Sequence, residues 1–280
     1  MNSDFSRTSP LLLRLPPPLA QMISGYTPRR IHIGQSAAKV FRLDAENKDS
    51  LYLKIAPRTT AHSLLREKTR LEWLVNRLPA PEILSFAEDE NTDYLLLSAI
   101  SGVDASDDSL KTDIPRIIEQ SVEGLKMIHA LPIENCPFDE RIDYKIELAK
   151  KLMENNLVDE DDFDESRRGR TAEDLFRELI ENKPAVEDLV FTHGDYCTPN
   201  IIFEKGRLKG FVDWGNAGVA DRYQDIALLT RSVVHNFGSE YEPSVFKIYG
   251  VDPDRKKIYF YRLLDEFLLL EKFVRRSSRK

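Results

Sequence analysis

Residues 191–216 read FTHGDYCTPNIIFEKGRLKGFVDWGN, and this stretch decides both the fold and the chemistry. It is typical of two strands joined by a polar turn, EKGR at 204–207. The triplet HGD ends at Asp195, Asn200 follows five positions later, and Asp213 comes directly after the second strand. An ordinary strand pair does not need polar groups in this order. These three side chains are therefore candidates for catalysis or metal binding.

The order and spacing of these groups match the catalytic loop and the magnesium-binding loop of protein kinases. In that arrangement Asp195 would accept the proton of the acceptor hydroxyl, while Asn200 and Asp213 would bind Mg²⁺. Magnesium prefers hard oxygen ligands and takes one or two carboxylates from the protein, so an Asp and an Asn fit its needs. The alternative is a hairpin whose polar residues lie in turns, and HGD alone would not exclude it. We expect His193 to brace the loop by hydrogen bonding to backbone rather than to transfer protons.

The composition excludes several classes of protein. The 280 residues are 41% hydrophobic and 31% charged, as in a globular protein. No stretch approaches the roughly 20 apolar residues of a membrane span, and Arg14 and three prolines interrupt segment 11–20, which argues against a signal peptide. The two cysteines, Cys136 and Cys197, are too few for a disulfide framework or a zinc site. The net charge of −7 argues against nucleic acid and favours a cationic small molecule. We therefore expect a cytoplasmic protein with no membrane partner.

The first third of the chain is predicted to be rich in strands. Strands are expected at 39–43 and 50–55 around the polar turn 44–49, and a hairpin is expected within 82–100. Between them, residues 61–78 have helical spacing and are followed by Pro79 and Pro81, which we expect to stop the helix. The apolar positions of this helix are Leu64, Leu65, Leu71, Leu74, Val75 and Leu78.

Beyond residue 102 the chain is predicted to be helical. The expected helices are 113–131, 141–156, 171–182, 221–237 and 254–276, interrupted by the hairpin quoted above. A strand-rich front of about 100 residues and a helical rear predict an α+β protein of two lobes with a cleft between them.

The sequence resembles the aminoglycoside 3′-phosphotransferases, a family within the protein-kinase-like fold. The resemblance is carried by THGDYCTPNIIF and GFVDWGNAGVADRYQDIALLTRS. It continues in GQSAAKVFRL, LYLKI, REK, LLLSAISG, LVDEDDFDE and YRLLDEF, so that it extends from about Ile31 to Phe267. It implies a smaller β-rich N-terminal lobe, residues 1–100, that binds nucleotide. It also implies a larger, mostly helical C-terminal lobe, residues 101–280, that carries catalysis and substrate binding.

The resemblance implies a set of nucleotide-binding residues in the first lobe. Kinases pair a strand lysine with a helix glutamate to aim the ammonium at the phosphates, and Lys54 with Glu67 would form this ion pair. Taken alone, Glu67 could equally be an exposed helix carboxylate. The full set implied is Ser36 near the phosphates, Tyr52 on adenine, Lys54, Glu67, and backbone groups near Ser98 and Ile100 at the base edge.

Two acidic segments would line the substrate pocket by the same resemblance. They supply Asp162, Asp164, Glu165, Asp265 and Glu266. A rim of carboxylates would attract a polycation and orient it through charge-assisted hydrogen bonds. Without the resemblance, a charge run such as DEDDFDE is usually a solvated loop.

The chain departs from the family pattern at two places. Asn216 follows DWG where the family usually has Arg, and residues 268–280 extend beyond the family's usual end. These departures put the identity of the substrate in doubt more than the reaction. Arg222 and Arg231 are expected to form structural ion pairs rather than to take part in the chemistry.

The prediction from all these features is a Mg²⁺-dependent transfer of the γ-phosphate of ATP or GTP to the 3′-hydroxyl of an aminoglycoside, conferring antibiotic resistance. The enzyme is expected to be a monomer. The alternative is a related kinase for a choline-, sugar- or macrolide-type hydroxyl compound. A protein kinase is disfavoured because no G-x-G-x-x-G loop or A-P-E segment is present. A non-catalytic nucleotide-binding protein would be expected to have lost the base or a metal ligand, and all are present here.

Overall fold

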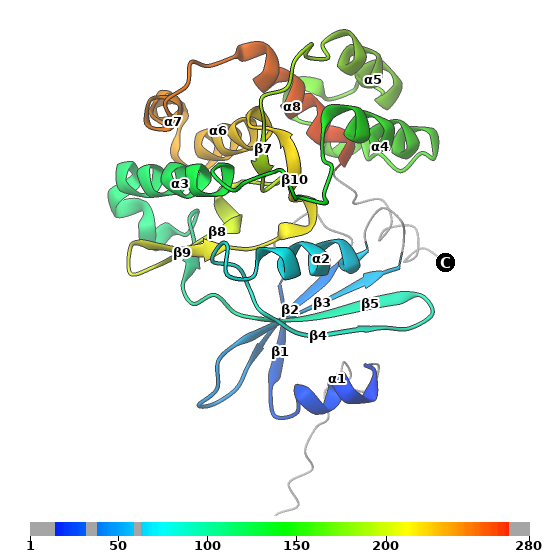
Figure 1. Ribbon diagram of the computed structural model, residues 1–280, viewed down its shortest axis with the longest axis vertical. Coiled ribbons are helices and arrows are strands. Elements are labelled where there is room, and N and C mark those ends of the chain that lie inside the picture. Colours follow the sequence, from blue (N-terminus) through cyan, green and yellow to red (C-terminus); the bar gives the residue numbers. More distant parts are fainter. Residues whose placement is uncertain (1–14, 32–37, 59–62, 269–280) are drawn as a thin grey trace, which may run out of the picture. The chain divides into compact units, whose positions relative to one another are not determined.

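The computed structural model describes residues 15–31, 38–58 and 63–268. The chain divides into two compact units (Figure 1). The first unit comprises Met1–Glu72 and Pro81–Ala99, and the second comprises Trp73–Ala80 and Ile100–Lys280. Among the described residues, no helix combines the length and apolar character needed to cross a membrane.

The first unit is built on an antiparallel sheet with the strand order β1-β2-β3-β5-β4. Its strands are β1 (Thr27–Ile31), β2 (Lys39–Asp44), β3 (Leu51–Pro57), β4 (Ile83–Glu88) and β5 (Thr92–Ser98). The expected strands at 39–43 and 50–55 and the expected hairpin within 82–100 are thereby confirmed. The strand β1 was not predicted. It pairs along its whole length with β2, from Thr27 opposite Asp44 to Ile31 opposite Val40.

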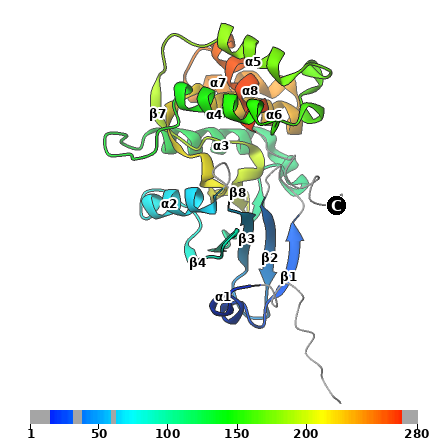
Figure 2. The same ribbon diagram turned by 90° about the vertical axis from the view of Figure 1, so that its right-hand side faces the viewer.

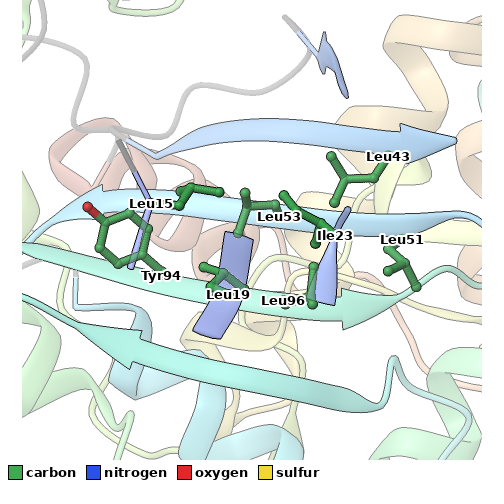
Figure 3. Packing of buried hydrophobic residues seen from close by; sticks show 8 residues of the cluster. All are labelled: Leu15, Leu19, Ile23, Leu43, Leu51, Leu53, Tyr94 and Leu96. Carbon is green, nitrogen blue, oxygen red and sulfur yellow. The ribbon is translucent and has the colours of Figure 1, made fainter. Parts of the chain in front are cut away.

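A short helix before the sheet, α1 (Pro17–Met22), was also not predicted. It begins with a proline in its first turn, where the missing N–H costs no hydrogen bond. Figure 3 shows its apolar side chains between the helix and the strands. The buried cluster contains Leu15, Leu19, Ile23, Leu43, Leu51, Leu53, Tyr94 and Leu96. Burying each leucine stabilises the unit by roughly 1.5–3 kcal/mol, so α1 supplies a substantial part of this core.

The helix α2 (Leu64–Leu74) ends earlier than the sequence predicted. The prolines at 79 and 81 do not stop it, because Asn76 already adopts a left-handed conformation with φ of 61°. The backbone N–H of residue 78 then donates to the carbonyl oxygen of Leu74 at 3.3 Å. Leu65 and Val75, which were expected on the apolar face, are 44% and 63% exposed.

The second unit contains most of the helices. They are α3 (Ile114–His129), α4 (Ile142–Glu154), α5 (Ala172–Glu181), α6 (Tyr223–Phe237), α7 (Glu242–Tyr249) and α8 (Arg255–Leu268). All five helices predicted for this region are present, and α7 is additional. The predicted extension of the last helix to residue 276 lies outside the described residues. In both views α5, α7 and α8 lie on one side of α3, with the hairpin β8–β9 on the other (Figures 1 and 2).

Residues 191–216 contain β8, β9 and the end of β7, which belong to the short strands of the second unit. They are β7 (Leu189–Thr192), β8 (Ile201–Glu204), β9 (Arg207–Phe211) and β10 (Gly218–Asp221), and β6 (Val103–Asp104) pairs with β8. The β8–β9 hairpin turns at Lys205 and Gly206, whose φ values of 53° and 70° are typical of a two-residue type I′ turn. The expected turn at 204–207 is confirmed. β7 pairs with β10, and Thr192 at the end of β7 lies opposite Gly218 at the start of β10. The loop that leaves β7 and the loop that leads into β10 are therefore neighbours at these two residues.

Candidate active site

The loop between β7 and β8 is braced by its own histidine. His193 is completely buried, and its Nε2 hydrogen bonds to the carbonyl oxygen of Val212 at 2.9 Å. Its Nδ1 accepts the backbone N–H of Asp195 at 3.3 Å. With Nε2 as the protonated nitrogen, both ring nitrogens are used by the backbone, which confirms the bracing role expected for His193.

Gly194 allows the loop to approach the segment that follows β9. Its φ is +84°, and a Cβ atom at this position would lie 2.0 Å from the carbonyl oxygen of Asn216. No other residue fits such a contact without moving the backbone. The glycine of HGD therefore packs the loop that carries Asp195 directly against the loop that carries Asp213.

Asp195 and Asn200 are joined by hydrogen bonds within the loop. The Asn200 Nδ2 donates to the backbone oxygen of Asp195 at 2.9 Å and to its Oδ2 at 3.0 Å. These bonds turn the amide nitrogen toward Asp195, so the amide oxygen is the group that would take a cation. Asp213 is exposed and adopts a left-handed conformation with φ of 68°. One amide oxygen and one carboxylate are a donor set that fits Mg²⁺, with phosphate and water as further ligands.

The electrostatic environment of Asp195 suits a general base. Burial raises the pKa of its carboxyl group, and the negative charges of Asp265 and Asp213 raise it further. The hydrogen bond from Asn200 and the positive charge of Arg231 act in the opposite direction, and the pKa is about 6. A carboxylate with this pKa is ionised at neutral pH, yet it accepts a proton more readily than an ordinary aspartate does.

A cavity of about 60 Å³ adjoins Asp195 within the second unit. Its polar lining includes Asp195, Asn216, Asp265 and the buried Lys145, and Leu228 contributes to its apolar wall. The position that departs from the family pattern, Asn216, therefore lies in the lining of this cavity.

The two arginines of this region are ion paired, as the sequence analysis expected. Arg231 contacts Asp265, with Nη2 and Oδ2 separated by 2.5 Å, and Arg222 contacts Asp188, with Nε and Oδ2 separated by 2.6 Å. The first pair does more than hold α6 to α8, because the charge of Arg231 also lowers the pKa of Asp195.

The acidic run at 159–165 forms short helical turns whose side chains serve partly as caps. Asp164 Oδ1 accepts the N–H and the hydroxyl of Ser166, and these bonds lower the pKa of Asp164. Glu165 is largely exposed, and Asp162 ends the first turn, with its N–H donating to the carbonyl oxygen of Asp159. The prediction that these residues bind substrate stays a prediction.

Asp265 and Glu266, although adjacent, have different surroundings. Asp265 lines the cavity beside Asp195, whereas Glu266 is 4% exposed and is not part of the cavity lining. The Glu266 carboxylate pairs with Arg167 at 2.6 Å and accepts the N–H of Asp164 at 3.1 Å. The structure therefore gives Glu266 a second task, which is to attach the acidic loop to α8.

The nucleotide-binding residues predicted for the first unit are placed as follows. Lys54 on β3 and Glu67 on α2 form a buried ion pair, with Nζ 2.7 Å and 2.8 Å from the two carboxylate oxygens. Tyr52 lies two residues earlier on β3, and the hydroxyl of Ser98, at the end of β5, accepts the N–H of Glu82. Ile100 lies two residues after β5, and Ser36 lies outside the described residues. The roles of these residues toward nucleotide stay predictions.

Sequence reasoning missed two residues that hold the catalytic loop. Asp225 is completely buried in the first turn of α6 and accepts the N–H groups of His193 at 2.7 Å and Gly194 at 2.8 Å. The ring of His129, at the end of α3, adds a hydrogen bond to Asp225 at 3.1 Å. Burial raises the pKa of Asp225, but the hydrogen bonds from His129 and from the backbone of His193 act in the opposite direction, and the pKa is lowered overall. An acidic residue in a first helical turn usually marks only a favourable interaction with the helix dipole, so this role of Asp225 has no clear signal in the sequence.

Comparisons with known proteins agree with this geometry. Residues 27–261 match the model of the phosphotransferase enzyme family. An aminoglycoside 3′-phosphotransferase from Niallia circulans is 40% identical over 237 residues, which are 84% of this chain and 90% of that protein. The crystal structure of an aminoglycoside-3′-phosphotransferase of type VIII has a TM-score of 0.83 and 31% identity, covering 90% of this chain and 97% of that one.

A further structure shows an aminoglycoside phosphotransferase of the 3″ type from Streptomyces rimosus in complex with ADP and streptomycin. It has a TM-score of 0.74 and 26% identity, and the match covers 88% of this chain and 93% of that one. The predicted α+β, kinase-like fold is confirmed by these neighbours. The extent of the family match and the 40% identity across most of both chains show that this protein belongs to the aminoglycoside 3′-phosphotransferase family.

Proposed function

We propose that this enzyme transfers the γ-phosphoryl group of ATP or GTP to the 3′-hydroxyl of a polycationic aminoglycoside, which confers resistance to the antibiotic. It would act in the cytoplasm as a monomer. The observation that carries the proposal is the environment of the Asp195 carboxylate. This carboxylate adjoins a cavity, is hydrogen-bonded to a side chain suited to magnesium, and has a pKa of about 6.

In the proposed reaction Asp195 accepts a hydrogen bond from the 3′-hydroxyl and orients its oxygen toward the γ-phosphorus. A bond forms between that oxygen and the phosphorus, and the bond between the γ-phosphorus and the bridging oxygen to the β-phosphate breaks. The hydroxyl proton passes to Asp195, and the nucleoside diphosphate leaves. Positioned proton transfer of this kind contributes roughly 10²–10⁴-fold in rate. Direct in-line transfer requires no covalent enzyme intermediate.

Asn200 and Asp213 would hold the magnesium ion through the Asn200 amide oxygen and the Asp213 carboxylate. The bound ion supplies positive charge that offsets the charge of the phosphates. Gly194 supports this arrangement because it lets the two loops pack together.

We assign nucleotide binding to residues 1–100 and catalysis with substrate binding to residues 101–280. Within the first region, the ammonium of Lys54 steadies the triphosphate. The short contacts with both oxygens of Glu67 support this role, because they fix the direction of a long and otherwise mobile side chain.

The carboxylates close to Asp195 support a cationic substrate. Asp265 and Asp213 already raise the pKa of Asp195, so an ammonium group bound beside them would offset this repulsion. Substrate binding would then lower the pKa of the base and keep it ionised in the complex. Such binding should weaken as the salt concentration rises.

The test is ADP release with Mg-ATP for the wild type and for Asp195→Asn. The acceptors would be kanamycin, a 3′-deoxy analogue, choline and a macrolide. Turnover on kanamycin that is lost with the 3′-deoxy compound and in the variant would support the reaction and its position. No turnover on kanamycin together with turnover on choline or the macrolide would replace the proposal with a related small-molecule kinase.

A further inference from the structure

A chain of polar contacts runs from the catalytic loop to the end of α7. Asp225 binds the loop backbone and the Nε2 of His129, as described above. On the other side of the ring, the Nδ1 of His129 lies 2.7 Å from the hydroxyl of Tyr249, the last residue of α7. The Nη1 of Arg222 donates to the same hydroxyl at 3.2 Å.

One assignment of hydrogens satisfies every group in this chain. Arg222 has only donors, so the Tyr249 oxygen accepts from it and the Tyr249 hydroxyl hydrogen is left to donate to His129 Nδ1. His129 then carries its own proton on Nε2 and donates it to the carboxylate of Asp225. The histidine is neutral in this assignment, and each contact has one donor and one acceptor.

Three members of this chain of contacts, His129, Asp225 and Tyr249, are almost closed to solvent, so water cannot easily replace them. The side chains of His129 and Asp225 are 4% and 0% exposed, and Tyr249 is 8% exposed. The contact between His129 and Asp225 is the longest one around the carboxylate, at 3.1 Å, and therefore depends most on the orientation of the ring.

We propose that Tyr249 is a positioning residue for phosphoryl transfer. Its hydroxyl orients the His129 ring, the ring orients Asp225, and Asp225 holds the two N–H groups of the loop that presents Asp195. Tyr249 touches no reacting group, so it acts only through this chain. The effect on turnover rests on the proposed function, whereas the effect on the loop backbone does not.

The variant that tests this is Tyr249→Phe. The ring remains, including its edge contact with the ring of His129 at 5.7 Å between centroids, so the change removes the hydroxyl alone. We expect kcat to fall roughly 3- to 10-fold, the equivalent of one ordinary hydrogen bond. The KM values for ATP and aminoglycoside should change less than about twofold, because the substrate contacts remain.

The matched control is Tyr223→Phe. The Tyr223 hydroxyl donates to the carbonyl oxygen of Asp252 at 2.6 Å and has no part in the chain. This variant also loses one tyrosine hydrogen bond and should lose comparable stability. A purely structural role for Tyr249 predicts the same behaviour for both variants, namely lower stability with an unchanged kcat.

Hydrogen exchange provides a readout that needs no substrate. The backbone N–H groups of His193 and Gly194 should exchange roughly 3- to 10-fold faster in Tyr249→Phe than in Tyr223→Phe, at equal global stability. If Tyr249→Phe keeps the wild-type kcat and the wild-type exchange of these two groups, the inference is overturned. If the wild type transfers no phosphate to any acceptor, the proposed function fails, and the exchange rates alone decide the role of Tyr249.

Discussion

Replacing Asp195 by Asn should abolish activity and at the same time stabilise the folded enzyme. The pKa of Asp195 is about 6, against an ordinary value of 3.8, because burial and nearby carboxylates disfavour its charge. Each tenfold change in proton affinity corresponds to about 1.36 kcal/mol. At pH 7.5 the ionised group therefore destabilises the fold by about 3 kcal/mol, which the neutral amide removes.

The destabilisation by Asp195 depends on pH because it arises only when the carboxyl group is ionised. A carboxyl group whose pKa is raised on folding is neutral in both states at low pH, so its cost vanishes there and grows as pH rises through 4 to 6. The same linkage relation gives roughly half of this destabilisation at pH 5. The advantage of Asp195→Asn over the wild type should thus roughly double between pH 5 and pH 7.5.

The assay is urea unfolding of both proteins, without nucleotide or metal, at the two pH values. Asp139→Asn serves as a control of opposite sign, because hydrogen bonds from Arg141 lower the pKa of Asp139. Its stability should lie below that of the wild type by a nearly constant amount at both pH values, because both lie above the pKa of Asp139 in the folded and the unfolded state. If Asp195→Asn has the same advantage at both pH values, or none at pH 7.5, the electrostatic reasoning about Asp195 is wrong.

Three further results are expected. The kcat/KM for phosphoryl transfer should rise with pH through about 6 in a pH–rate profile, because the free enzyme must hold Asp195 ionised; a profile flat from pH 5 to 8 would contradict this. Glu67→Gln should raise the KM for ATP and lower the free energy of unfolding by roughly 3 kcal/mol in urea, because the buried ammonium of Lys54 loses its carboxylate. Gly194→Ala should leave no measurable turnover, because its Cβ cannot fit beside Asn216; an active variant with an unchanged melting temperature would refute this.

The parts of the fold that the sequence predicted well are those with strong local patterns. The helices at 114–129 and 223–237 have apolar residues at helical spacing and differ from their predicted bounds by one or two residues. The hairpin around Lys205 and Gly206 was recognisable from its turn residues. In the candidate site, Asp195, Asn200 and Asp213 could be proposed from the sequence because their spacing is fixed by one short loop and one hairpin.

The parts that the sequence did not predict depend on tertiary contacts. The left-handed Asn76 ends α2 before either proline is reached, and nothing in the local pattern marks it. Asp225 reads as an ordinary acidic residue of a first helical turn until its position under the catalytic loop is known. Glu266 resembles its neighbour in sequence, but only the partner Arg167, 99 residues earlier, reveals its task.

The position of Asp225 on α6 also bears on how such enzymes can be recombined. The loop that carries Asp195, the loop that carries Asp213 and the aspartate that supports the first of them all fall in the continuous stretch from Leu189 to Phe237. A chimera of two homologous genes with its crossover inside this stretch would join a loop from one parent to a support from the other. Crossovers outside it inherit the stretch as one block and leave contacts such as Asp225 with His129 and Arg231 with Asp265 to be matched across the junction.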